Sequence, residues 1–310
     1  MKNVINRALA AKKKIFTLFA AVLMAAVMMA DENESQKAKF TYEAGAEVVS
    51  SYIWRGLYNG GLSFQPSASV GFVSPSDKVK FDINVWGSVG ASDWKFRKGQ
   101  PNPDAEGYNP NTYFVPEVDF TATLQIYGLV LGATHYYYFG GAPFFSKLED
   151  DGGSQTEVMV GLRFGEFSKA SGLFFNWHTM VAGNDVFYKE TYDSNGNLTD
   201  IKAKRAWSSY FEFGYEAEFE YDITLGITIG MTPWRSLYTD YEGTFAVNNL
   251  SLRFGKTWNV AEIVDIELFA LGSMNTYKIN KDNCFAWEAG DYKLGAAQRL
   301  NGTIGLGFWF

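Results

Sequence analysis

Cysteine and histidine are scarce in this chain of 310 residues, which has one cysteine, Cys284, and two histidines, His135 and His178. A single cysteine excludes an intramolecular disulfide framework and any zinc site built from several cysteines. Two histidines also argue against a histidine-rich metal centre. We therefore expect neither a metal nor a cofactor.

Long hydrophobic runs are missing after residue 30, where no apolar stretch approaches the ~20 residues of a transmembrane helix. The one earlier run, Ile15–Ala30, follows a basic head and precedes the polar stretch DENESQK. This arrangement is typical of a secretory signal peptide. A membrane anchor is the alternative, and the run is slightly short for one. We expect residues 1–30 to be a signal peptide and residues 31–39 a short periplasmic segment.

Basic residues are also outnumbered, because the chain has 27 Lys and Arg against 34 Asp and Glu, for a net charge of −7. Residues 1–30 carry five basic side chains and no acidic one, so the net charge without them is −12. An acidic chain of this kind argues against nucleic acid as a partner.

The chain does contain a regular alternation of apolar and polar residues. Period-two segments of about ten residues, separated by turns, are typical of transmembrane β-barrel strands. Glycine, with 31 residues, and aromatic residues, at 17%, also favour β structure over helix. The expected strands are 40–56, 62–74, 79–91, 113–126, 129–140, 156–165, 173–184, 207–220, 222–233, 245–256, 262–277 and 296–310.

The connections between these segments are sorted by length. Those after every second strand are short, as in PSDK, YG, EFSKASG, YD and TWNVA. The others are long and polar, except for the tight LYNGG at 57–61. Short periplasmic turns and long outer loops are the pattern of bacterial outer-membrane barrels. We therefore predict an all-β fold, a single antiparallel up-and-down barrel of about 12 strands over residues 40–310. A soluble secreted β-sandwich is the alternative fold, and it has no reason to sort its loops in this way.

The two faces of the strands support the same interpretation. In segment 207–220, aromatic residues share one parity, while four glutamates share the other. A soluble core does not hold that many unpaired carboxylates, whereas a lipid-facing side and a wet lumen can hold both sets. Segment 222–233 repeats the pattern with isoleucines on one face and threonines on the other.

The last ten residues, NGTIGLGFWF, alternate to the end of the chain. We expect this strand to pair with the first one, so that Phe308 and Phe310 face lipid. An alternating last strand with a terminal phenylalanine resembles the insertion signal that the outer-membrane barrel assembly machinery reads. Phe308 and Phe310 are therefore the expected assembly signal.

Five short motifs in residues 50–162 resemble those of the TorF-type porin family of bacterial outer-membrane proteins. They are SSYIWRG at Ser50–Gly56, NVWGS at Asn84–Ser88, PEVDF at Pro116–Phe120, GATHYYYF at Gly132–Phe139 and TEVMVGL at Thr156–Leu162. The resemblance implies an outer-membrane barrel with a pore role. It implies no substrate, because the long loops and later strands depart from the pattern.

The inward parity carries more acids than bases, which predicts a pore lining that favours cations. The alternative is a plugged barrel whose charges pair across a narrow lumen. Arg55 could clamp an anionic group of a substrate or tie strands together. Trp86 and Tyr136 could stack on a solute or simply fill space. The expected lining is Glu43, Glu47, Arg55, Lys80, Asp82, Trp86, Glu117, Asp119, Glu157, Arg163, Glu212, Glu216, Glu218, Glu220, Arg253, Asp265, Glu267 and Arg299.

Two further features of the sequence bear on catalysis and metal binding. A hydrolase would need a serine beside His135 or His178, and neither THYYY nor NWHTM supplies one nearby in sequence. The stretch YDSNGNLTD has acid spacing that suggests calcium, but Asn-Gly between strand-like flanks favours a plain hairpin tip.

The sequence therefore predicts a porin-like, non-enzymatic channel in the outer membrane of a Gram-negative bacterium. Its expected partners are outer-membrane lipid, the barrel assembly machinery and small polar or cationic solutes. An outer-membrane hydrolase and a plugged structural barrel are the alternative functions.

Overall fold

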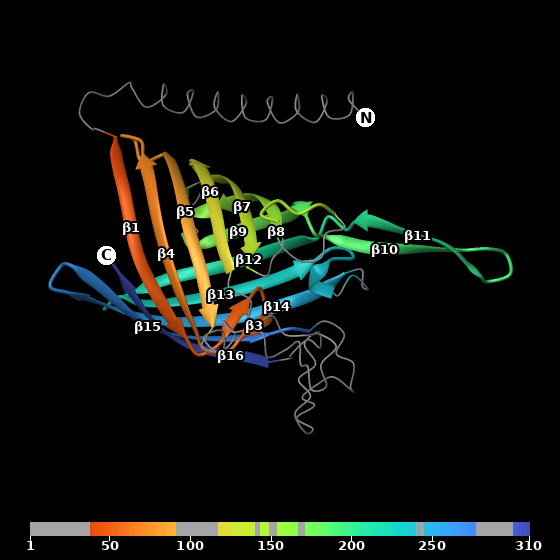
Figure 1. Cartoon of the computed structure of the whole chain (residues 1–310). Helices are drawn as coiled ribbons and strands as arrows, with labels where there is room; N and C mark the ends of the chain where they lie inside the picture. The colour runs from red at the N-terminus through yellow and green to blue at the C-terminus, as the bar shows by residue number, and fades with distance from the viewer. Residues whose placement is uncertain are drawn as a thin grey trace.

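A computed structural model describes residues 38–90, 117–139, 143–148, 154–166, 171–239, 241, 245–276 and 300–310. Twelve antiparallel strands close into one barrel (Figure 1), as the sequence predicted. Among the described residues, no helix has the length and apolar character needed to cross a membrane. The barrel strands are β1 (Lys39–Val49), β4 (Ser63–Val73), β5 (Val79–Gly90), β6 (Glu117–Ile126), β7 (Leu129–Tyr138), β8 (Ser154–Arg163), β9 (Leu173–Gly183), β12 (Ser209–Phe219), β13 (Ile223–Thr232), β14 (Ala246–Val260), β15 (Val264–Met274) and β16 (Leu300–Trp309).

The first and last strands form the closing seam of the barrel, as expected. Strand β16 pairs with β1 from Gly45 opposite Trp309 to Val49 opposite Gly305. The terminal residue extends this ladder, because the Phe310 amide donates to the Ala44 carbonyl at 2.8 Å. Phe310 is 66% exposed and lies on the outward parity of the strand. The alternating last strand is therefore held by hydrogen bonds on both sides.

The two ends of the barrel differ in their connections. We call the end that holds the start of β1 and the end of β16 the turn end, and the opposite end the loop end. At the turn end, β12 and β13 are joined through Tyr221 and Asp222, with φ of 65° and 55°. Ala261 and Glu262 connect β14 to β15 with φ of 57° and 56°. Two adjacent residues with positive φ suit hairpin turns, because their twist matches that of the strands.

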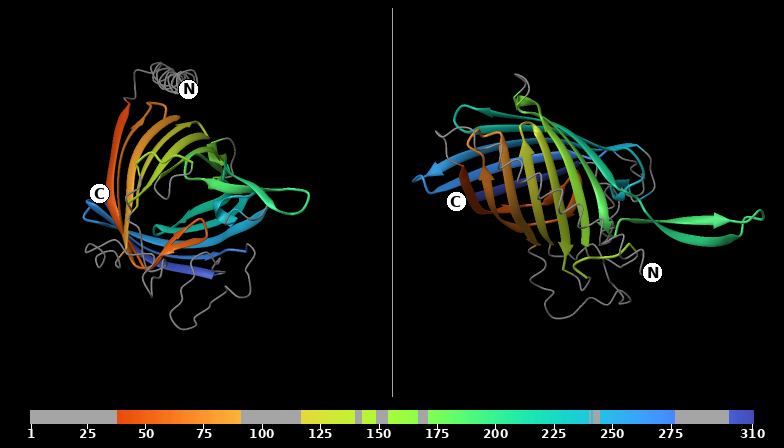
Figure 2. Two further views of the ribbon diagram at one scale, coloured as in Figure 1. Left: turned by 45° about the vertical axis from the view of Figure 1, so that its right-hand side comes forward. Right: turned by 90° about the horizontal axis from the view of Figure 1, so that it is seen from above.

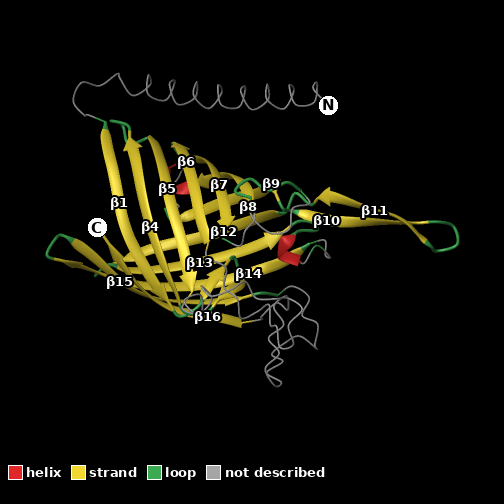
Figure 3. Cartoon of the chain, viewed as in Figure 1, coloured by secondary structure: helices red, strands yellow, loops and turns green. Residues whose placement is uncertain are grey.

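A separate hairpin of β10 (Val186–Tyr192) and β11 (Leu198–Arg205) extends beyond the loop end (Figure 3). Its tip is the Asn-Gly turn, where Gly196 has φ of 81°. The carboxylate of Asp193 accepts hydrogen bonds from the backbone amides of Asn195 and Asn197, both at 2.8 Å. The stretch expected to form a hairpin tip does so.

The first connection at the loop end differs from the expectation. The predicted strand 40–56 stops at Val49, and the supposedly tight turn at 57–61 belongs to a second hairpin of β2 (Tyr52–Trp54) and β3 (Leu57–Gly60). Arg55 and Gly56 make its turn, with φ of 49° and 81°. Apolar alternation continues through Tyr52–Trp54, so periodicity alone could not locate the break.

Hairpin β2–β3 folds into the barrel instead of extending a wall strand (Figure 2). It forms its own two-stranded sheet, and its residues contact side chains on several sides of the lumen. The Asn301 amide of β16 donates to the Gly56 carbonyl at 3.2 Å, and the Ser51 amide donates to the Thr303 hydroxyl at 3.0 Å. The hairpin is therefore tied both to the seam strand and to the far wall.

Candidate functional site in the barrel lumen

Arg55, at the tip of hairpin β2–β3, makes a bidentate ion pair with Glu157 of β8. Its Nη1 lies 2.6 Å from Glu157 Oε2, and its Nη2 lies 2.8 Å from Glu157 Oε1. The side chains are 10% and 3% exposed. A bidentate Arg–carboxylate pair fixes orientation as well as supplying energy. The ion pair therefore determines where the hairpin tip sits.

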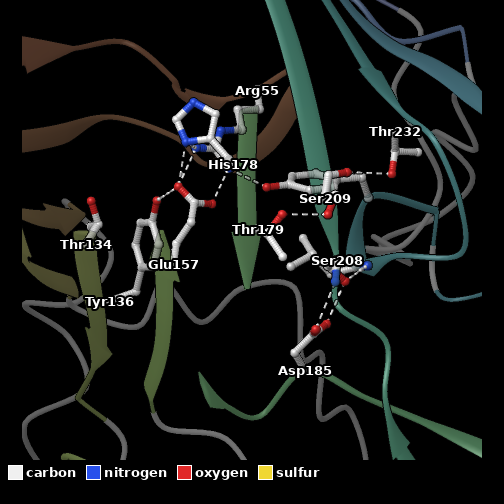
Figure 4. Close-up of polar contacts among 12 residues, drawn as sticks. Arg55, Thr134, Tyr136, Glu157, His178, Thr179, Asp185, Ser208, Ser209 and Thr232 are labelled. Atoms are coloured by element: carbon white, nitrogen blue, oxygen red, sulfur yellow. Dashed lines mark hydrogen bonds and ion pairs between the residues drawn. The ribbon is translucent and has the colours of Figure 1, made fainter. Parts of the chain in front are cut away.

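Other side chains complete this cluster, which Figure 4 shows in part. Tyr136 donates to Glu157 Oε1 at 3.2 Å, and Tyr238 accepts from Arg55 Nη1. The guanidinium also lies over the rings of Trp54 and Tyr210, with Cζ at 4.7 and 4.8 Å from their centroids. Cation–π contacts of this kind add to the ion pair where water is excluded. We call Arg55, Tyr136, Glu157, His178, Tyr210 and Tyr238 the latch.

His178 of β9 contacts both members of the ion pair through one ring nitrogen. Its Nδ1 is 2.8 Å from Arg55 Nη2 and 2.7 Å from Glu157 Oε1. Arginine can only donate and an ionised carboxylate can only accept. One nitrogen therefore accepts from Arg55 when it is unprotonated, or donates to Glu157 when it carries a proton. A proton on Nδ1 exchanges one contact for the other.

A second group of buried side chains holds the base of the hairpin. The Tyr52 hydroxyl donates to Glu117 Oε2 at 3.0 Å, and its ring packs against Trp86 with centroids 5.5 Å apart. Glu117 and Asp119 of β6 are only 4% and 9% exposed. Five of the expected lining residues therefore lie in the hairpin or around it at the loop half: Arg55, Trp86, Glu117, Asp119 and Glu157.

In the turn half of the lumen, fewer of the charged side chains are paired with an opposite charge. Arg253 Nη2 pairs with Glu267 Oε1 at 2.7 Å, and Asn259 donates to Asp265 at 2.7 Å. Glu220 lies in the exposed turn after β12, and Arg299 lies outside the described residues. The other expected lining residues occupy the inward parity of their strands here: Glu43, Glu47, Lys80, Asp82, Arg163, Glu212, Glu216, Glu218, Arg253, Asp265 and Glu267.

A cavity of about 420 Å³ opens in this turn half, against β8, β9 and β12. Its lining includes Arg163, Phe174, Asn176, Glu212 and Glu216. Arg163 Nη1 donates to Asn176 Oδ1 at 2.8 Å, and Asn176 Nδ2 donates to Glu212 Oε1 at 3.0 Å. Parity predicted three of the four charged residues of this lining, Arg163, Glu212 and Glu216, but not Glu166, which follows β8. Asn176 was missed, although it shares the inward parity of its segment.

The geometry gives no support to the hydrolase alternative. His135 faces outward, with Nδ1 2.9 Å from the Thr156 hydroxyl and Nε2 2.9 Å from the Phe144 carbonyl. The buried Ser208 hydroxyl donates to Asp185 at 2.5 Å (Figure 4). Within the described ranges, neither histidine makes a hydrogen bond to a serine. A serine–histidine nucleophile is therefore not assembled there.

The chain was compared with known proteins. No protein-family model matches it, and no curated protein sequence matches it either. Similar solved structures include the NanC porin (7% identity, TM-score 0.38, 87% of this chain and 99% of that chain). Others are OmpF of Salmonella typhi in complex with daunomycin (9%, 0.32, 89% and 98%) and an anion-selective porin from Comamonas acidovorans (7%, 0.29, 88% and 98%). With TM-scores below 0.5, no family or function is transferred from them, and the TorF-type resemblance stays a prediction.

Proposed function

We propose that the chain is an outer-membrane channel for passive diffusion of small polar solutes, with a preference for cations. One observation carries this proposal: the barrel is apolar on its outside and charged on its inside. Outward residues such as Ile227, Ile229 and Leu252 are 44%, 42% and 44% exposed, whereas inward Glu157 has a side chain only 3% exposed. A water-soluble protein has the opposite arrangement. An outward apolar band with a polar interior is what a membrane barrel requires.

Orientation follows from the connections and termini. Short turns face the periplasm in barrels of this kind, so the turn end is the proposed periplasmic side. The expected signal peptide would deliver the chain there. Phe308 and Phe310 would then be available to the barrel assembly machinery before the seam closes. Outer-membrane lipid would cover the apolar band.

Cation preference is supported by the unequal charge of the turn half. Acidic residues on the inward parity outnumber Lys80, Arg163 and Arg253 there, and Arg253 is paired with Glu267. Successive same-face residues along a strand are ~7 Å apart, and the screening length at ~0.15 M salt is ~8 Å. Glu216 and Glu218 are one such step apart, so their charges add. Glu212 lies two steps, ~14 Å, from Glu216 and extends the acidic face toward the loop half, which favours cations along this wall.

Planar-bilayer recording under a salt gradient tests the proposal. We expect the mature chain to conduct, with a reversal potential that shows cation preference. Changing Glu212, Glu216 and Glu218 together to Gln should weaken that preference, because Gln keeps nearly the same volume without the charge. Glu190→Gln, on the external hairpin, is the matched control and should leave selectivity unchanged. Anion preference in the unmodified protein would contradict the proposed selectivity.

The docked hairpin favours one second candidate, a plugged barrel with a structural role. The latch and the Tyr52–Glu117 contact compensate charge in the loop half and place side chains where solute would pass. If neither the unmodified protein nor a variant with a released hairpin conducts, the plugged barrel is the better account.

A further inference from the structure

The 420 Å³ cavity in the turn half is lined by one cationic residue, Arg163, and by three acidic residues, Glu166, Glu212 and Glu216. Arg163 Nη1 is engaged by Asn176 Oδ1 at 2.8 Å and by the Leu162 carbonyl at 3.3 Å. Its Cζ lies 5.4 Å from the Phe174 ring centroid. Within the described part of the chain, it forms no ion pair with Glu212 or Glu216. The guanidinium has five N–H donors, so most of its donor capacity remains for a ligand.

Asn176 acts as the spacer between the opposite charges. Its Oδ1 holds Arg163 and its Nδ2 holds Glu212 Oε1 at 3.0 Å. Without this bridge, a guanidinium and a carboxylate on nearby strands of one wall would be expected to pair directly. The amide therefore preserves a gap with a positive side and a negative side.

Glycines in the wall leave room for this arrangement. A Cβ at Gly161 would lie 2.6 Å from Asn176 Oδ1, and a Cβ at Gly214 would lie 2.1 Å from Phe174 Cζ. Any other residue at these positions would displace the amide or the ring, because real Cβ contacts are not that short. The site is therefore supported by the backbone around it. Its volume is also in the range of ~300–1,000 Å³ that is typical of small-molecule sites.

We infer that this cavity binds a small zwitterion with an ammonium group and a carboxylate, such as an amino acid or a dipeptide. The ligand carboxylate would take the free donors of Arg163, and its ammonium group would lie against Glu216 and Glu212. An anion alone meets three carboxylates and one guanidinium in the lining, and a cation alone leaves Arg163 without a counter-ion. This inference rests on the proposed channel function, for which it names a solute class.

Isothermal titration calorimetry on the detergent-purified mature chain tests the inference, with glycylglycine as the probe. Acetate and ethylammonium carry the same charged groups singly, and we expect both to bind at least tenfold more weakly. Arg163→Gln and Glu216→Gln should each weaken glycylglycine binding at least tenfold. Glu190→Gln, on the external hairpin and outside the cavity lining, is the matched control and should bind as the unmodified protein does.

Three results would overturn the inference: no binding of glycylglycine, binding no tighter than that of the single-charge probes, or unchanged binding by Glu216→Gln. The last variant also guards against misfolding, because Glu216 is exposed and makes no ion pair among the described residues. Calorimetry does not depend on conductance. If the barrel conducts but does not bind glycylglycine, only the zwitterion site is contradicted. If it binds glycylglycine but does not conduct, only the channel function is contradicted.

Discussion

Removal of the Arg55 side chain should release hairpin β2–β3 from the lumen. The hairpin shares no sheet with the barrel wall, so side-chain contacts and hydrogen bonds to β16, such as the one from Asn301 to Gly56, hold it in place. Arg55 supplies the bidentate pair with Glu157 and the stacking on Trp54 and Tyr210. Arg55→Ala removes all of these at once and leaves every barrel strand unchanged.

The size of the effect follows from the burial of the ion pair. Removing one partner of a buried pair costs about 3–5 kcal/mol, because the other charge is left uncompensated. Each ~1.4 kcal/mol changes an equilibrium tenfold, so the undocked hairpin should become ~100- to 3,000-fold more populated. Tyr136 and His178 still contact Glu157. Because these two side chains still compensate part of the Glu157 charge, we expect an effect at the lower end of this range.

Single-channel recording measures this change. Arg55→Ala should raise the open probability or the unit conductance, because the hairpin leaves the loop half. Arg253→Ala is the matched control, since it removes a lumen arginine from an ion pair at 2.7 Å in the turn half, away from the hairpin. If Arg55→Ala conducts like the unmodified protein, or changes no more than Arg253→Ala does, the latch does not restrict the channel.

Three further predictions concern the seam and the external hairpin. Deleting Phe310, whose backbone extends the seam, should sharply reduce folded protein in the outer membrane; normal levels on membrane fractionation would refute its assembly role. A Cβ at Gly45 would lie 2.2 Å from Trp309 Cε3, so Gly45→Ala should lower the free energy of unfolding in urea by about 1–3 kcal/mol. Gly272→Ala, where a Cβ meets no atom within 4 Å, should cost less, and an equal loss would count against steric crowding at the seam. At the tip of β10–β11, hydrogen bonds to the Asp193 carboxylate lower its pKa, and the largest contribution comes from the backbone amide of Asn197. The stabilisation from these contacts is present above the ordinary pKa of ~3.9 and disappears as pH falls through the lower pKa of the folded state. Carbon NMR titration of this carboxyl should find a midpoint below ~3.9, and a higher midpoint would contradict the contact.

The barrel could be predicted from sequence because its strongest constraint is local. Each strand has one face toward apolar surroundings and one toward polar surroundings, so the period of two is written into every segment. Pairing of the last strand with the first could also be predicted, because an alternating strand at the chain end needs a neighbour on each side. Strand ends moved by a few residues, as at 245–256, which runs from Ala246 to Val260 in the structure.

The latch could not be predicted because its partners lie far apart in sequence. Arg55 and Glu157 are separated by 102 residues, and Arg55 and Tyr238 by 183. Parity placed Arg55 and Glu157 on the inward face, but it carries no information on which charges meet across a lumen. Tyr238 lies in the connection after β13, outside any alternating segment, and no sequence signal marked it.

Strand length nevertheless contains a clue to the inward hairpin. A transmembrane β-strand needs ~9–11 residues, and the expected segment 40–56 is the longest of the twelve, which favours departure of its last part from the wall. Tyr52, Ile53 and Trp54 are poorly suited to an exposed loop, and Arg55 at their end requires a carboxylate if it is buried. A lumen rich in acids satisfies both needs, because it offers covered surface for the aromatic rings and a counter-ion for the guanidinium. An over-long first strand that ends in an aromatic–arginine–glycine turn is thus a physical signal for a hairpin folded into the barrel, and Glu157 supplies the carboxylate that the signal demands.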